Sequence, residues 1–124
     1  MPIQLVMEKM IDDLLLTGCD DWIHIADLIW TVSSIGGATT KSEIREMVIN
    51  IVREVLLQGL VTIGDVKKDG YHDWGITMDE ALERMKERWD ALNRQPLTGD
   101  ICWLEITKKG IERARTSEGT GALP

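Results

Sequence analysis

The fold is decided by the stretch ICWLEITKKGIERA, residues 101–114. Residues 101–106 are mostly apolar and include β-branched side chains, which is typical of a strand. Thr107, the basic pair Lys108-Lys109 and Gly110 follow at once, and residues 111–114 read as the start of a short helix. A strand that passes directly into a helix predicts that a sheet ends at this point and that a C-terminal helix follows it. The helical segments before it are therefore expected to belong to the same fold.

Three helices are predicted ahead of the sheet. The first covers residues 3–17, where apolar residues recur at helical spacing, and Gly18 is its expected end. The second is expected to begin at Asp20-Asp21, whose carboxylates can accept hydrogen bonds from free amide groups at a helix start, and to close at Gly36-Gly37. The third, about Thr40 to Gln58, keeps an apolar face over three turns.

The middle of the chain predicts a strand, an aromatic loop and a fourth helix. Residues 60–66 are rich in β-branched side chains and are expected to form the strand. Residues 69–75 contain two glycines and three aromatic or imidazole side chains, which predicts a turn-rich loop. Thr77 and Glu80 form a capping-box pattern before the helix at 78–93. Thr39 or Thr40 is expected to cap the third helix. Residues 116–124 are expected to be a loose tail.

The composition indicates one acidic domain. The chain has 124 residues, of which 44% are hydrophobic, and 14 Lys and Arg against 21 Asp and Glu give a net charge of −7. The first 38 residues contain six carboxylates and one lysine, a net charge of −5. Such a balance disfavours a phosphate backbone as partner, and favours either a basic protein surface or simple solubility.

The order of these elements resembles that of the winged helix-turn-helix superfamily, over residues 3–114. The resemblance rests on Leu60-Val61 after the third helix and on Ile106-Thr107-Lys108-Lys109-Gly110 at the end of the sheet. It implies an α+β domain with three N-terminal helices, a small antiparallel sheet with a helix inserted in the wing, and a short C-terminal helix. Residues 1–115 would form this single domain.

In most members of this superfamily the third helix enters the major groove of DNA and the wing contacts the backbone. For this chain the resemblance places Lys41, Ser42 and Arg45 in the reading positions and Lys67 and Lys68 at the wing. The third helix does not have the charge of a DNA reader, because three basic and three acidic residues between positions 39 and 60 cancel. A winged-helix transcriptional regulator is therefore the alternative interpretation.

A non-enzymatic protein-binding module is the favoured interpretation. The superfamily includes protein-binding members, and the chain is similar in size and charge to small acidic bacterial immunity proteins, which neutralise a toxin. Carboxylates would then steer a basic toxin domain, and aromatic side chains would anchor it. The candidate partner-binding residues are Asp12, Asp13, Asp20, Asp21, Trp22, Tyr71, His72, Asp73 and Trp74. The helix at 78–93 could support a homodimer under either interpretation.

The aromatic residues allow two interpretations of the segment Tyr71-His72-Asp73-Trp74. It could be a binding hot spot, or it could be a wing tip whose aromatic rings fold back onto the helix that carries Trp89. Trp30, Trp89 and Trp103 occur at core spacing and are expected to be buried.

No pattern for catalysis, a metal or a cofactor is found. Cys19 and Cys102 have no CxxC spacing and are expected to be buried apolar residues. The two histidines belong to no His-x-x-x-His or Glu-x-x-His pair, and no phosphate-binding loop is present. No apolar run is long enough for a membrane helix and no signal sequence is evident, so a cytoplasmic protein without a membrane partner is expected.

Overall fold

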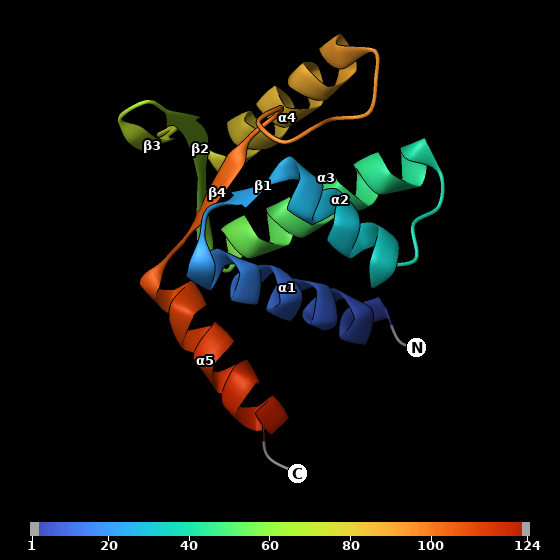
Figure 1. Cartoon of the computed structure of the whole chain (residues 1–124). Helices are drawn as coiled ribbons and strands as arrows, with labels where there is room; N and C mark the ends of the chain where they lie inside the picture. The colour runs from blue at the N-terminus through green and yellow to red at the C-terminus, as the bar shows by residue number, and fades with distance from the viewer. Residues whose placement is uncertain (1–2, 123–124) are drawn as a thin grey trace.

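Residues 3–122, described by a computed structural model, form five helices and a four-stranded antiparallel sheet (Figure 1). Side-chain surroundings are described for residues 4–116. The elements are α1 (Ile3–Asp20), β1 (Ile23–His24), α2 (Ile25–Ser34), α3 (Lys41–Leu57), β2 (Val61–Lys67), β3 (Gly70–Asp73), α4 (Met78–Leu92), β4 (Trp103–Ile106) and α5 (Lys108–Ala122). The α+β class predicted from the sequence is confirmed.

The sheet has the order β1-β4-β2-β3. The C-terminal strand β4 thus lies between β1 and β2, while β2 and β3 form a hairpin. In Figure 1 the helices α1, α2 and α3 lie together to one side of the sheet. We call the face toward these helices the inner face; it carries the buried side chains Ile23, Val61, Ile63 and Leu104.

The core joins this inner face to the apolar sides of the helices. Ile11, Leu14 and Leu15 of α1 and Val48, Ile51 and Val52 of α3 are almost fully buried. α4 buries Ala81, Leu82, Met85 and Trp89 in the same cluster, which confirms the prediction for Trp89. Because this apolar side of α4 is used within the chain, the structure gives no support to a dimer formed through it.

Two tryptophans predicted to be core residues are not. Trp30 is 59% exposed, because α2 buries Ile25, Leu28 and Val32 and turns position 30 toward solvent. Trp103 is only partly buried, because it alternates along β4 with Leu104 and so points to the other face of the sheet. Cys102 is buried as expected, whereas Cys19 is exposed near the end of α1.

The connection between the first two helices differs from the prediction. α1 continues past Gly18 to Asp20, and Gly18 serves close packing, since a Cβ there would lie 3.1 Å from Ile23 Cδ1. Asp20 and Asp21 do not start the second helix. The Asp21 carboxylate accepts from the Trp22 amide (2.7 Å), and Asp27, not either of them, accepts from the His24 amide (3.1 Å) at the start of α2.

The predicted capping box at Thr77 is confirmed, and Thr40, one of the two threonines expected to cap the third helix, makes a second capping box. The Thr40 hydroxyl accepts from the Glu43 amide (3.1 Å), and the Glu43 carboxylate accepts from the Thr40 amide (3.0 Å). Thr77 and Glu80 make the same exchange at the start of α4. Each pair satisfies two amide groups that a helix start would otherwise leave free.

Acidification is expected to destabilise the fold through these boxes. Hydrogen bonds from Thr40 hold the pKa of Glu43 below its usual 4.5, and hydrogen bonds from Thr77 do the same to the pKa of Glu80. A carboxyl whose pKa is lowered by folding stabilises the protein above its unfolded pKa, and that contribution is lost as the pH falls through the lowered value. Urea unfolding should therefore give a smaller free energy of unfolding below about pH 4 than at about pH 7.

The variant Glu43→Gln with Glu80→Gln is the control for this pH effect. Glutamine can accept the same hydrogen bonds but does not titrate. We expect its stability to change less between the two pH values than that of the parent chain. An equal change in both proteins would exclude the capping carboxyls as a source of the effect.

The predicted aromatic loop is partly a strand. Residues 70–73 form β3, paired with β2 in the register Val66–Tyr71 and Gly64–Asp73, and Lys68 and Asp69 make the turn. The last strand is shorter than predicted. Ile101 has a left-handed backbone (φ 66°) and the Cys102 amide donates to the Asp100 carbonyl (2.8 Å), so regular pairing starts only at Trp103.

Thr107 fixes the start of α5, the helix that the sequence predicted after the last strand. Its hydroxyl donates to the Gly59 carbonyl (2.7 Å) and accepts from the Gly110 amide (3.1 Å), and its amide donates to the Leu60 carbonyl (3.0 Å). The helix then extends to Ala122. The predicted tail, residues 116–124, overlaps the end of this helix and residues outside the described part of the chain, so it stays a prediction.

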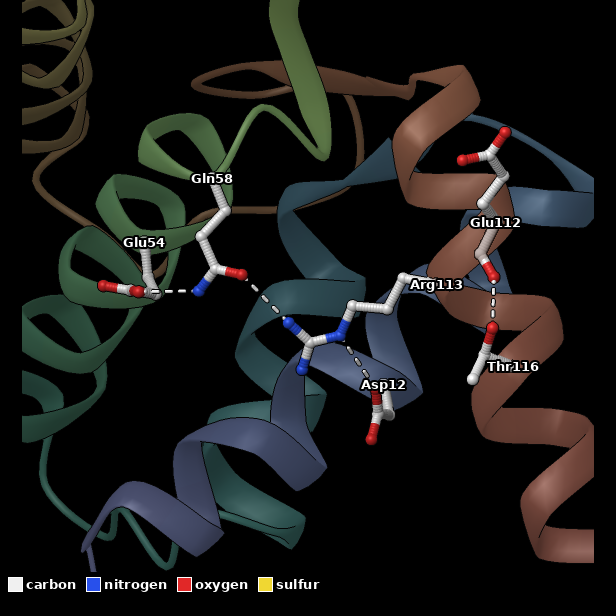
Figure 2. Close-up of polar contacts among 6 residues, drawn as sticks. All are labelled: Asp12, Glu54, Gln58, Glu112, Arg113 and Thr116. Atoms are coloured by element: carbon white, nitrogen blue, oxygen red, sulfur yellow. Dashed lines mark hydrogen bonds and ion pairs between the residues drawn. The ribbon is translucent and has the colours of Figure 1, made fainter.

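A polar network ties α5 to α1 and α3 (Figure 2). Arg113 Nε donates to Asp12 Oδ1 (3.3 Å), and Arg113 Nη1 donates to Gln58 Oε1 (3.0 Å). Gln58 in turn donates to Glu54 (2.7 Å). This network and the Thr107 contacts hold the C-terminal helix against the domain.

Candidate functional site

The face of the sheet opposite the core carries most of the remaining aromatic side chains. Directly opposed residues in an antiparallel pair share a face. The register therefore assembles an outer face from His24, Thr62, Gly64, Val66, Tyr71, Asp73, Trp103 and Glu105. Trp22, just before β1, contacts two of these residues and belongs to the same surface.

Four rings on this surface form what we call the aromatic cluster: Trp22, His24, Tyr71 and Trp103. Trp22 and Tyr71 stack with ring centroids 6.4 Å apart and planes 22° from parallel. His24 meets Trp103 edge to face, with centroids 5.5 Å apart. All four side chains are partly buried, so each keeps some surface open to solvent.

Hydrogen bonds fix two of these rings. Trp22 Nε1 donates to Glu105 Oε2 (2.9 Å), and the Tyr71 and Thr62 hydroxyls share a hydrogen bond (2.7 Å). Burial raises the pKa of Tyr71 well above its usual range, and the charges of Asp73 and Glu105 raise it further. The Tyr71 hydroxyl therefore stays protonated at neutral pH.

Carboxylates border the cluster. Asp73 and Glu105 are exposed on the outer face, and Asp20 and Asp21 are exposed immediately before Trp22. The outer face itself contains no lysine or arginine in the register given above. The surface thus combines ordered aromatic rings with a negative border.

The structure separates the residues that the sequence grouped at positions 71–74. Tyr71 joins the aromatic cluster, whereas His72 points to the other face of β3 and contacts Asp69 (2.6 Å). Asp73 lies on the outer face and accepts from the Gly75 amide (2.6 Å). Trp74 packs onto α4, with the guanidinium groups of Arg84 and Arg88 at 4.7 and 4.9 Å from its ring. Of the two aromatic rings in this segment, Trp74 therefore folds back onto the helix that carries Trp89, and Tyr71 does not.

Two predicted partner-binding carboxylates have internal contacts. Asp12 pairs with Arg113, and Asp13 accepts from the Thr31 hydroxyl (2.8 Å). Both are partly buried, so they serve the packing of α1 against α5 and α2. Asp20 and Asp21 remain exposed and lie next to the aromatic cluster.

His24, Trp103 and Glu105 belong to this surface although the sequence reading did not assign them to it. The available signal was the alternation along residues 103–106, in which Trp103 and Glu105 share one face and Leu104 and Ile106 the other. Nothing local predicted that His24 would pair with Trp103, because β1 has only two residues.

The alternative DNA-binding residues fall into two separate places. Lys41 and Ser42 are exposed at the start of α3, while Lys67 and Lys68 lie at the β2–β3 turn. In Figure 1 these places are at opposite sides of the molecule, with α4 between them. Arg45 contacts Asp90 of α4 (3.1 Å), so one cation of the set is already paired.

Cys102 offers no reactive thiolate, because burial raises its pKa to about 12. Within the part of the chain that the structure describes, no three His, Cys, Asp or Glu side chains lie close enough to hold a metal ion. Among the same residues, none of the helices combines the length and the apolar character needed to cross a membrane.

No protein-family model, curated protein or solved structure matches the chain. The outer face, with its aromatic cluster and acidic border, is the strongest candidate for a functional site of this chain.

Proposed function

We propose that the protein is a non-enzymatic binding module that holds a basic protein partner against the outer face of its sheet. The observation that carries the proposal is the aromatic cluster bordered by exposed carboxylates. Binding energy at protein interfaces is concentrated in a few Trp, Tyr and Arg side chains near the centre, surrounded by a polar rim. The outer face has this arrangement.

The anchors are ordered before any partner binds. Glu105 holds the Trp22 indole and Thr62 holds the Tyr71 hydroxyl. Immobilising a flexible side chain during association costs about 0.5–1.5 kcal/mol, and a ring that is already fixed avoids much of that cost. A partner that covers Trp22 and Tyr71 would therefore use most of their contact energy for affinity.

The charge of the surface selects the class of partner. Asp20, Asp21, Asp73 and Glu105 place four carboxylates around the cluster on a chain of net charge −7. Complementary charge speeds association and suppresses wrong partners. An immunity-type protein that neutralises a basic bacterial toxin is the most concrete form of this function.

In this proposal the domain is winged-helix-like. Its support is the order α1, β1, α2, α3, β2, followed by a return strand β4 that inserts between β1 and β2. The β2–β3 hairpin and α4 then take the place of a simple wing.

A DNA-binding regulator has less support. α4 packs along α3, and Arg45 contacts Asp90 there. α4 also carries five carboxylates against three cations, which a duplex approaching α3 would meet. The lysines at the β2–β3 turn lie apart from the basic residues of α3, so the two groups form no continuous positive strip.

Site-specific photo-crosslinking tests the proposal. A photoreactive amino acid at Asp21, beside the aromatic cluster, should capture one basic protein in the cells that make this chain. The same amino acid at Glu83, exposed on α4, is the matched control and should capture little of that protein. Equal capture at both positions, or capture only at Glu83, would place the binding surface elsewhere.

Reversing the charge of Asp20 and Asp21 is expected to slow association with the captured partner. The double variant Asp20→Lys with Asp21→Lys should lower the association rate by about tenfold at low salt and change the dissociation rate little, because these carboxylates act by steering. Stopped-flow kinetics at two salt concentrations would measure both rates.

The variant Glu83→Lys with Glu87→Lys makes the same change in net charge on the exposed side of α4. It should retain most of the association rate. If both variants slow association equally, only the total charge matters and the acidic border has no special role.

A further inference from the structure

We propose a second site: the groove between α3 and α4 binds a small molecule that carries phosphate groups. A depression of about 370 Å³ opens between these helices and is lined by Ser42, Arg45, Glu46, Asn50, Arg53 and Lys86. A second depression of about 570 Å³ adjoins Ser42 and Arg45 and reaches Lys41 and Arg94. We call the two together the α3–α4 groove.

The first depression is positive on an acidic protein. Arg45, Arg53 and Lys86 line it with Glu46 as the single carboxylate, so three cations meet one anion. In the described part of the chain Lys86 forms no ion pair, and Arg53 contacts only the uncharged Asn50 carbonyl oxygen (2.8 Å). Because Arg45 is paired with Asp90, Arg53 and Lys86 remain against Glu46 and leave the depression a net positive charge.

Arg45 lies between the two depressions and has unused donors. Only its Nη2 contacts Asp90, and its buried Nε has no hydrogen-bond partner in the described structure. A side chain that leaves donors free at a cavity wall can accept an anionic ligand by a small rotation, because charge-assisted hydrogen bonds are the strong ones.

Neutral donors complete the lining. The Ser42 hydroxyl lines both depressions, and Arg53 holds the oxygen of Asn50, which leaves the Asn50 amide nitrogen free to donate. Phosphate oxygens accept several such hydrogen bonds together with guanidinium and ammonium groups. The groove thus offers the donor set that a phosphate group requires.

The shape of the groove favours a small ligand over a nucleic-acid duplex. The Arg45–Asp90 contact (3.1 Å) joins the two walls, and the exposed side of α4 presents Glu83, Glu87 and Asp90. A rigid duplex would meet these carboxylates before its phosphates reached Arg53 and Lys86. A phosphorylated small molecule can reach Arg53 and Lys86 without approaching Glu83 or Glu87. Of these three carboxylates, Asp90 lines the groove, and it is already paired with Arg45.

This site is separate from the proposed protein-binding surface. The helices that form it pack on the inner side of the sheet, whereas the aromatic cluster lies on the outer face. In this site Lys41, Ser42 and Arg45 would bind the phosphate groups of a small molecule rather than contact DNA.

A titration with inorganic pyrophosphate, followed by amide chemical shifts in NMR spectra, tests this proposal. Saturable shifts should centre on Ser42, Arg45, Arg53 and Lys86, and sodium chloride at matched ionic strength should not reproduce them. Arg53→Gln with Lys86→Gln should weaken binding by about tenfold or more, because each substitution removes a charged donor.

Lys67→Gln with Lys68→Gln is the matched control, since it removes two exposed charges at the β2–β3 turn. It should leave pyrophosphate binding unchanged, and thermal melts would show that both variants fold. Equal weakening in the two variants, or an absence of saturable shifts in the parent chain, would overturn the proposal. A parallel titration with a short DNA duplex that binds where pyrophosphate does not would also overturn it, in favour of nucleic-acid binding.

Discussion

Replacing Gly110 by alanine is expected to lower the free energy of unfolding by about 3 kcal/mol. A Cβ at this position would collide with the Leu60 carbonyl oxygen and lie 2.6 Å from Ile106 Cγ1. The carbonyl cannot move away freely, because it accepts from the Thr107 amide (3.0 Å). The substitution therefore forces α5 away from the sheet or breaks the contact that starts the helix.

Urea unfolding followed by circular dichroism would measure this loss. Helix propensity alone predicts the opposite sign, since alanine is favoured over glycine within a helix by about 1 kcal/mol. Lys109→Ala, at the exposed neighbouring position, should change stability by less than about 0.5 kcal/mol. If Gly110→Ala is as stable as the parent chain, α5 does not dock through this close approach.

Replacing Trp22 by alanine is expected to weaken binding of the partner about 30-fold, equivalent to about 2 kcal/mol. The indole stacks on Tyr71 and is fixed by Glu105, so it presents an ordered apolar surface at the middle of the outer face. Its removal takes away the largest anchor of the cluster. Isothermal titration calorimetry with the captured partner would measure the change.

Trp30→Ala is the matched control for Trp22→Ala. Trp30 is a 59% exposed tryptophan on α2 that takes no part in the described aromatic contacts. Its replacement should leave affinity unchanged, and urea unfolding of both variants would separate lost folding from lost binding. Greater weakening by Trp30→Ala would move the binding surface to α2.

Sequence reasoning predicted the elements whose signals are local. The capping box of Thr77 with Glu80 was found as expected, and of the two threonines expected to cap the third helix the structure selects Thr40. Such signals act within one helical turn, so they do not depend on the rest of the fold.

The errors occurred where distant contacts decide the structure. Gly18 resembles a helix stop, but the approach of Ile23 and Ile106 explains it, and α1 continues to Asp20. Trp30 is apolar at helical spacing, yet the packing of α2 selected Ile25, Leu28 and Val32 for burial. Periodicity gives the width of an apolar stripe and not which of its residues meets the core.

The candidate site was only partly predictable for the same reason. Trp22 and Tyr71 were both identified from the sequence, but Tyr71 was grouped with His72 and Trp74. Strand alternation sends Tyr71 and His72 to opposite faces, whereas Trp74 lies past the end of β3 and packs on α4. The contact between Trp22 and Glu105 joins residues 83 positions apart and exists only because β4 pairs with β1.

The indole N–H signals of the five tryptophans provide the most direct measurement of where the partner binds. Trp22 and Trp103 belong to the outer face, Trp30 to α2, Trp89 to α4, and Trp74 packs on α4. When the captured partner is added, NMR spectra should show changes in the Trp22 and Trp103 signals, while those of Trp30, Trp74 and Trp89 stay in place. Changes confined to Trp30, or to Trp74 and Trp89, would contradict binding at the outer face of the sheet.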